Sequence, residues 1–438
     1  MLWIPTKPWR KVTARLKRRR RMRRGARLFL FGLIIFGLSQ ATVAPDHLLD
    51  VQIDRITQAY QFDFVNWETE AIVEEIGRQL YQRTLGEDMT DQQDIVRTFL
   101  EQQQRIAELE REIRRIYANS DSISTDAVGP ETRLAILQAA QRDIIYQVET
   151  ILAQQAEVIL SEQGFTIVGQ TVPPVSFRLI EPPTFLIISP RERIERQQTL
   201  NLKPGLNDAY REEIEAILDQ RGDVSSYVTN IGGMGSYPAM VIRYGYMPYL
   251  ADVIIHEWTH NYLFTFQSNM AWGFVDNPRL HTLNETTSTL VGEELSRELI
   301  LRYYPEWADQ LPPLDQKTGQ PKPFEPSEYH LTMRRIRQTT DELLAAGKIE
   351  EAEMFMEEER QKLVEKGHNL RKLNQAYFAF HGSYALSPGS VDPTGQHIRQ
   401  LRASSPSLKS FVDRMGRINS YDEYLQWLDE VGIERASE

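Results

Sequence analysis

The types and spacing of residues that metal binding needs occur at His256, Glu257 and His260. Residues four apart lie on one face of an α-helix, so the imidazoles of His256 and His260 can share a metal ion. Glu257 stands at the edge of that face, where its carboxylate can reach water at the metal without binding the metal. The pattern is H-E-x-x-H, which is typical of zinc hydrolase sites. The alternative is a core helix that carries two ordinary histidines.

A third ligand is available downstream at Glu285, 25 positions after His260. Gly273 and Pro278 interrupt the intervening chain, so it has room to turn back. Asn284 is a suitable N-cap, and the residues after it read as a second helix with Glu285 in its first turn. Two histidines and one carboxylate leave the fourth zinc position open for water, which is typical of catalytic rather than structural zinc.

The flanking residues separate the known classes of H-E-x-x-H protein. The metzincin pattern needs glycine and histidine three and six residues beyond His260, but Leu263 and Phe266 stand there. H-E-x-x-H with a distant Asn-Glu pair resembles the gluzincin peptidases. The order IIHEWTHNYLF … LNETTSTLVGEE is most similar to a bacterial family named as aminopeptidases. The resemblance is specific over residues 228–300, weak near the C-terminus and absent before about residue 171.

The resemblance implies a zincin-like domain that hydrolyses peptide bonds with Zn²⁺ held by His256, His260 and Glu285. Glu257 is then the general base that takes a proton from water and later gives it to the leaving amine. The oxyanion would be stabilised from the C-terminal part, where His381 and Tyr384 are the candidates.

Residues around the ligands could orient them. Thr289 follows Glu285 by one helical turn, and Asp252 precedes His256 by one turn. Either side chain could hydrogen-bond to a histidine ligand. Many gluzincins carry an acid at the position of Thr289, which makes Asp252 a substitute candidate. His281 is expected to be a solvated loop residue.

A glycine-rich stretch precedes the motif and contains Gly232, Gly233 and Gly235. Glycine lets one backbone approach another closely, and Pro238 suits an edge strand rather than an interior one. Gluzincins pair the substrate main chain with an edge strand placed shortly before the H-E-x-x-H helix, so these glycines are candidate substrate-binding residues. An ordinary glycine-rich turn is the alternative.

The first 45 residues read as a targeting segment. Residues 1–27 hold twelve basic residues and no acid, and residues 28–38 are almost wholly apolar. A basic region before an apolar core of this length is typical of a signal peptide or an uncleaved signal anchor. The basic run would keep the N-terminus in the cytoplasm and place the rest outside the membrane. The protein would be secreted if the segment were cleaved.

The net charge and the cysteine content limit the kinds of partner and metal site that the protein can have. The formal charge is −11, and because residues 1–27 are purely basic, the remainder carries −23. A strongly acidic remainder disfavours nucleic acid as a partner, and a peptide or protein substrate is expected instead. The chain has no cysteine, which excludes disulfides and thiolate metal sites.

The hydrophobic pattern predicts a mostly α, α+β fold. Residues 46–170 show apolar residues at helical spacing on charged backgrounds, which indicates a helical region. Residues 171–438 begin with strand-like segments and then hold the predicted site helices, so we expect them to form the zincin-like domain. Two highly charged helices are expected around Gly347.

Two other functions remain open from the sequence. A catalytically silent zincin-like protein could bind a partner through its helices, and a metal-dependent hydrolase could act on another kind of amide. Glu257 favours an enzyme over the silent protein, because a purely structural metal site does not need a base beside its ligands.

Overall fold

A computed structural model describes residues 48–81, 89–118, 125–266, 277–314, 326–382 and 393–434. The chain divides into two compact units, residues 1–58 and residues 59–438. In the first unit the described residues form helix α2, Leu48–Thr57. All that follows concerns the second unit.

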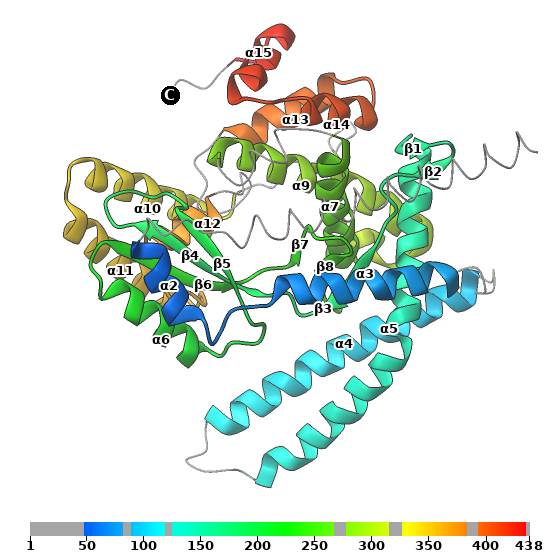
Figure 1. Cartoon of the computed structure of the whole chain (residues 1–438), viewed down its shortest axis with the longest axis horizontal. Coiled ribbons are helices and arrows are strands. Elements are labelled where there is room, and N and C mark those ends of the chain that lie inside the picture. Colours follow the sequence, from blue (N-terminus) through cyan, green and yellow to red (C-terminus); the bar gives the residue numbers. More distant parts are fainter. Residues whose placement is uncertain are drawn as a thin grey trace, which may run out of the picture. The chain divides into compact units, whose positions relative to one another are not determined.

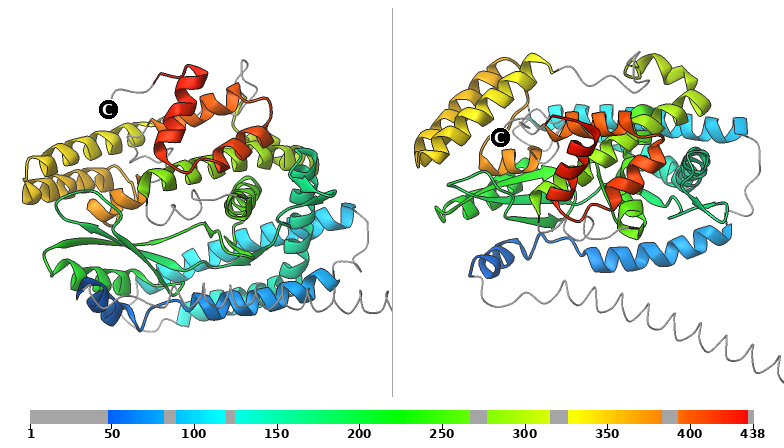
Figure 2. Two further views of the ribbon diagram at one scale, coloured as in Figure 1. Left: turned by 45° about the horizontal axis from the view of Figure 1, so that its top comes forward. Right: turned by 90° about the horizontal axis from the view of Figure 1, so that it is seen from above.

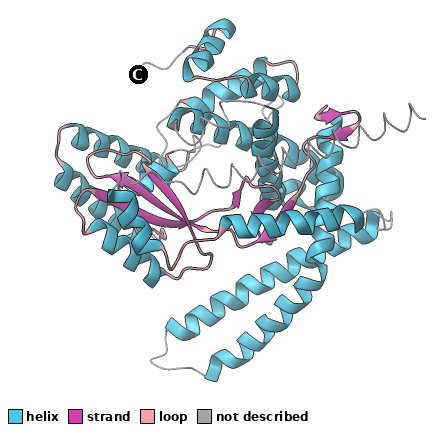
Figure 3. Ribbon diagram, in the orientation of Figure 1, coloured by secondary structure: helices cyan, strands magenta, loops and turns pink. Residues whose placement is uncertain are grey.

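The described part of the second unit is mostly helical with small sheets, which confirms the predicted α+β class (Figure 3). Its longer helices are α3 (Phe64–Tyr81), α4 (Met89–Ala118), α5 (Val128–Glu162), α6 (Asp208–Asp219), α7 (Met247–Phe266), α9 (Pro278–Tyr303), α10 (Glu328–Ala345) and α11 (Ile349–Glu365). Towards the C-terminus follow α12 (Gln375–His381), α13 (Thr394–Ser404), α14 (Leu408–Gly416) and α15 (Tyr421–Val431). Two 3₁₀ segments are η2 (Thr125–Ala127) and η3 (Pro305–Gln310).

The strands in the described ranges form three small sheets. An antiparallel hairpin joins β1 (Thr166–Ile167) and β2 (Gln170–Thr171). A second sheet has the order β5 (Gln198–Leu202), β4 (Thr184–Pro190), β6 (Val224–Asn230), all antiparallel. The third has the order β3 (Phe177–Ile180), β8 (Ala239–Ile242), β7 (Gly233–Met234), with β3 parallel and β7 antiparallel to β8.

Helices α7 and α9 lie side by side at the centre of the unit (Figures 1 and 2). Both contribute apolar side chains, among them Ile255 and Val291, to one core cluster that also takes Val148 and Ile151 from α5. Strands β3 and β8 add Leu179 and Val241 to the same core. The helix that carries H-E-x-x-H is therefore fixed on several sides by apolar packing.

Local sequence signals account for several of these elements. Asn207 caps α6, and its side chain accepts a hydrogen bond from the backbone N–H of Tyr210. The charged pair α10 and α11 is joined through Gly347, whose φ of +73° is a conformation that favours glycine. The strand-like segments after residue 171 form β3 and β4.

None of the helices in the described ranges is long and apolar enough to cross a membrane. The apolar segment that the sequence predicts as a signal anchor lies outside the described residues.

Candidate metal centre

Helix α7 presents His256, Glu257 and His260 near its middle. The residues between and beside them, such as Ile255, Trp258 and Thr259, are buried against the core. Trp258 Nε1 also donates a hydrogen bond to the carbonyl oxygen of Pro173 at 2.8 Å, which fixes the rotation of the helix. The two histidines therefore face away from the apolar core and towards α9.

The second site helix begins earlier than the sequence analysis predicted. Helix α9 starts at Pro278, and Asn277 is its N-cap, accepting hydrogen bonds from the backbone N–H groups of Arg279 and Leu280. The prediction that Asn284 caps this helix is wrong, because Asn284 lies two turns inside it. An asparagine followed by proline at the first helical position is itself a known helix-start signal. That signal was present at residues 277 and 278.

His256, His260 and Glu285 form a group that could bind a metal. The two Nε2 atoms lie 3.0 Å apart. Oε2 of Glu285 is 3.4 Å from Nε2 of His256 and 3.7 Å from Nε2 of His260. The side chains are largely covered, with 17%, 13% and 8% exposed. The structure therefore brings together the three residues that the sequence selected as ligands.

The spacing of these three atoms suits zinc. Zinc bonds to histidine nitrogen and carboxylate oxygen are about 2.0–2.2 Å long, so ligand atoms at a tetrahedral ion are roughly 3.3 Å apart. The observed separations of 3.0, 3.4 and 3.7 Å bracket that value. Two imidazoles with one carboxylate are also a donor set that zinc uses in catalytic sites.

The charges of the group are strongly coupled. Burial lowers the pKa of His256. Burial also opposes protonation of His260, but Glu285, with smaller contributions from Glu257 and Asn284, raises its pKa to about 9. Burial opposes ionisation of Glu285, yet His260 and His256 hold the pKa of its carboxyl well below the usual value. A carboxylate and a shared positive charge thus occupy one small, mostly buried space, and a metal cation can take the place of that charge.

Asn284 has a role that the sequence analysis missed. Its Oδ1 accepts a hydrogen bond from Nδ1 of His260 at 2.7 Å, and Oγ of Ser288 lies 3.3 Å from the same nitrogen. A hydrogen bond of this kind fixes the orientation of a ligand imidazole and leaves its other nitrogen for the metal. Asn284 is therefore a positioning residue.

Thr289 and Asp252, the two predicted orienting residues, make other contacts. Oγ1 of Thr289 donates to the carbonyl oxygen of Glu285 at 2.9 Å. Oδ1 of Asp252 is buried without a hydrogen-bond partner among the described residues, and burial raises the pKa of Asp252 to about 8. It lies against Gly292 of α9, where a Cβ would come within 2.5 Å of Oδ1. A glycine at 292 thus allows the close approach of α7 and α9.

The glycine segment, defined as residues 232–236, runs directly along the motif helix. A Cβ at Gly233 would lie 2.2 Å from Oε1 of Glu257, and one at Gly235 would lie 3.0 Å from Cβ of His260. Nδ2 of Asn261 donates to the carbonyl oxygen of Ser236 at 3.0 Å, which ties the segment to α7. A side chain at Gly233 or Gly235 would therefore require Glu257 or His260 to shift.

Glu257 lies under this segment and is only 5% exposed. Burial is the main cause that raises its pKa, to about 8. The carboxylate lies against the backbone of Gly233, and the charge of His260 partly offsets the effect of burial on its pKa.

The remaining predicted site residues lie in different settings. His281 is not a solvated loop residue, since it belongs to α9 and is 4% exposed, with Nδ1 3.9 Å from Oε1 of Glu285. His381 ends α12, where its ring packs 4.2 Å from that of Tyr377, and burial lowers its pKa to about 4. Tyr384 lies outside the described residues. The roles of His381 and Tyr384 stay predictions.

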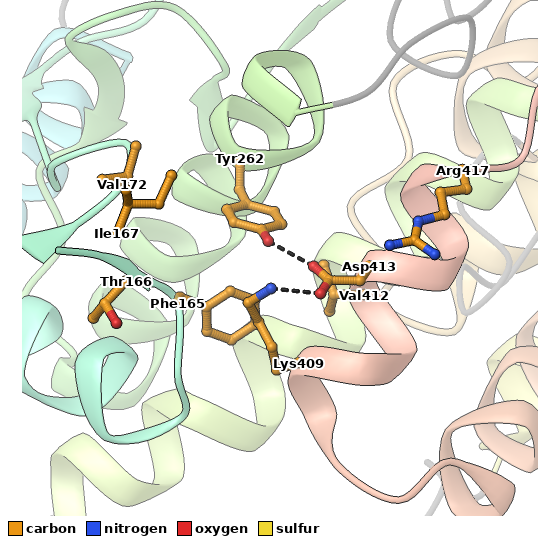
Figure 4. A pocket seen from close by; sticks show the side chains of 9 residues that line it. All are labelled: Phe165, Thr166, Ile167, Val172, Tyr262, Lys409, Val412, Asp413 and Arg417. Atoms are coloured by element: carbon orange, nitrogen blue, oxygen red, sulfur yellow. Dashed lines mark hydrogen bonds and ion pairs between the residues drawn. The ribbon is translucent and has the colours of Figure 1, made fainter. Parts of the chain in front are cut away.

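A separate cavity of about 280 Å³ holds none of these residues (Figure 4). Tyr262 of α7 donates to Oδ1 of Asp413 at 2.6 Å, and Lys409 pairs with the same carboxylate. Tyr262 follows His260 by two residues, so it projects from nearly the opposite side of the helix. The cavity therefore lies apart from the metal-binding group.

Comparison with known proteins gives no match. No protein-family model matches the sequence, and no curated protein or solved structure matches it.

Proposed function

We propose that this protein is a zinc-dependent peptidase that acts at the His256–His260–Glu285 group. The observation that carries the proposal is the meeting of three ligand atoms within 3.0–3.7 Å with Glu257, the next residue along α7, at their side. When bound, zinc would supply a Lewis acid that polarises a peptide carbonyl and acidifies water.

Glu257 acts as the general base. Its buried carboxylate takes a proton from the attacking water and passes it to the leaving amine. Asn284 keeps Nδ1 of His260 protonated, so that Nε2 stays available for the metal.

The glycine segment binds the substrate main chain. The N–H of Ile242 donates to the carbonyl oxygen of Gly232 at 2.9 Å, and Gly233 opposes Val241 in the antiparallel pair. Alternate residues of an antiparallel strand direct their backbone groups towards and away from the partner. The N–H and C=O of Gly233 therefore point away from β8, at an edge that no other described strand occupies.

An extended peptide that pairs with this edge would pass over Glu257. The carboxylate lies against Gly233, so the base and the hydrogen-bonding edge meet at one residue. Strand addition of this kind binds a peptide through its backbone. Such binding accepts peptides of many different sequences, which suits a peptidase.

We also propose that the catalytic unit lies outside the membrane, held by an N-terminal anchor. The basis is the run of twelve basic residues before an apolar core, followed by a strongly acidic remainder.

The test combines metal analysis with hydrolysis of a peptide library by the full-length protein. Wild type should hold close to one zinc per chain and cleave peptides. Glu257→Gln should keep the zinc and lose at least ~10²-fold in activity, the lower end of what loss of a general base costs. His260→Ala or Glu285→Ala should lower both, because each removes a ligand.

The different results expected for these variants distinguish the general base from the metal ligands. Full activity of Glu257→Gln would rule out the proposed base, and unchanged zinc affinity of Glu285→Ala would rule out the third ligand. Absence of peptide hydrolysis by zinc-loaded wild type would contradict the function itself.

A further inference from the structure

Two exposed tyrosine rings, Tyr244 and Tyr249, stand beside the glycine segment. Their centroids are 4.9 Å apart in an edge-to-face arrangement, and the residues are 47% and 36% exposed. Aromatic side chains usually bury most of their surface, so an exposed pair of this kind offers apolar area to a ligand.

Tyr249 is directly linked to the proposed site. It precedes His256 by seven residues on α7, so the two side chains lie on the same face of the helix. A Cβ at Gly232 would lie 2.3 Å from Oη of Tyr249, and one at the next residue, Gly233, would lie 2.2 Å from Oε1 of Glu257. Because consecutive Cα atoms are about 3.8 Å apart, the phenol and the base lie against adjacent residues of the glycine segment.

The pKa of Tyr249 agrees with this closeness of its phenol to Glu257. Burial is the main cause that raises the pKa of Tyr249, and the charges of Asp252 and Glu257 raise it further.

The loop that carries Tyr244 is held rigidly. Nε2 of Gln104 in α4 donates to the carbonyl oxygen of Gly245 at 2.6 Å. A Cβ at Gly245 would lie 2.9 Å from the backbone nitrogen of Gln104, so the loop packs directly on the helix. The ring of Tyr246 packs 5.3 Å from that of Trp307. A wall fixed in this way loses little conformational freedom when it binds a ligand.

We propose that Tyr244 and Tyr249 form a substrate subsite for an aromatic side chain. The inference rests on the proposed function, because the ligand is a peptide paired with the edge at Gly233. A peptide in that position continues past Gly232, where the two rings stand, and its side chain there can pack against them.

The test uses the full-length, zinc-loaded protein and peptides of equal length. Each position on either side of the cleaved bond is occupied in turn by Phe, Leu, Lys or Ala. At one of these substrate positions, wild type should cleave the Phe peptide with a kcat/KM roughly tenfold higher than the Ala peptide. This is the size of effect expected when a ring is buried against aromatic partners. In Tyr244→Ala and Tyr249→Ala, that ratio should fall towards one.

Two further variants separate the subsite from a general loss of structure. Tyr249→Phe keeps the ring and should keep the preference for Phe. Tyr210→Ala removes a tyrosine of α6 that is 46% exposed and packs 5.7 Å from the ring of Tyr60, so it is a matched control and should leave the ratio unchanged.

A binding measurement on the Glu257→Gln background gives a readout that does not depend on turnover. Calorimetric titration should show tighter binding of the Phe peptide than of the Ala peptide, and Tyr249→Ala should remove the difference. A wild type with no aromatic preference, a preference for Lys, or a preference that survives both alanine variants would overturn the subsite while peptide hydrolysis still stands. Failure to cleave or bind any peptide would overturn the subsite and the proposed function together.

Discussion

The side-chain oxygen of Asn284 lies 2.7 Å from Nδ1 of His260. An amide oxygen can only accept a hydrogen bond, so Nδ1 carries a proton, and Nε2 is the nitrogen that faces His256 and Glu285. The contact joins α9 to α7. The orientation of one candidate metal ligand therefore depends on how these two helices pack.

Asn284→Leu should weaken metal binding by about 10–100-fold, the usual effect of losing a hydrogen bond behind a ligand. Asn284→Asp retains an acceptor and should keep most of the affinity. The measurement is a competitive titration with a zinc chelator.

The matched control for this prediction is Thr287→Val. Thr287 is also buried in α9, but its Oγ1 donates to the carbonyl oxygen of Leu283 at 2.7 Å. The Thr287→Val variant should therefore bind zinc as tightly as wild type. Equal affinity of wild type and Asn284→Leu would mean that Asn284 does not position the histidine.

Gly233→Ala should impair turnover while zinc stays bound. The new Cβ would meet Oε1 of Glu257 at 2.2 Å, which forces the base or the strand to move. A displacement near 1 Å at a reacting group can cost about 10²-fold in rate. Peptide kinetics and zinc content should be measured on the same preparation.

Gly129→Ala is the matched control for this change. Gly129 lies near the start of α5, and a Cβ there meets nothing within 4 Å. Its activity should equal that of wild type. If Gly233→Ala were equally active, the glycine segment would be an ordinary turn rather than a substrate edge.

Asp252 should make the protein less stable as the pH rises. Burial, with a contribution from the charge of Glu293, raises its folded pKa to about 8, whereas an unfolded aspartate titrates near 4. Between these values the folded state holds a proton that the unfolded state has lost. The contribution of this proton to stability is fully present below about pH 4 and is lost by about pH 8, at up to about 1.4 kcal/mol per pH unit.

Asp252→Asn removes this titration, so denaturant unfolding at several pH values tests the prediction. The advantage of the variant over wild type should grow from pH 4 to pH 8. The charged and titratable groups that act on the site, Glu293 on α9 and Tyr249 on α7, are present in both proteins. A constant difference between the two proteins across this range would show that Asp252 ionises normally.

The predicted topology can be checked with reporters fused after Ser437. A reporter that is active only outside the membrane should be active there, because the basic run is expected to retain the N-terminus in the cytoplasm. A reporter active only in the cytoplasm should be silent. The reverse result would invert the topology.

The sequence by itself determined the candidate ligands. The four-residue spacing of His256 and His260 is a local property of an α-helix, so their meeting on one face follows directly from the chain. Composition and periodicity also indicated the mostly helical α+β class, because helix formation depends largely on local pattern. Gly347 was recognised for the same reason, since turn signals act over a few residues.

Only the tertiary structure decided what surrounds these ligands. Asn284 reads as a helix cap from its neighbours, but packing of α9 against α7 turns its amide towards His260. His281 is buried because α9 begins at Asn277–Pro278 and carries it into the core. The contacts of Gly233 with Glu257 and of Gly232 with Tyr249 join segments that are 24 and 17 residues apart in the chain. Such contacts depend on how helices and strands pack together, which no local pattern of residues specifies.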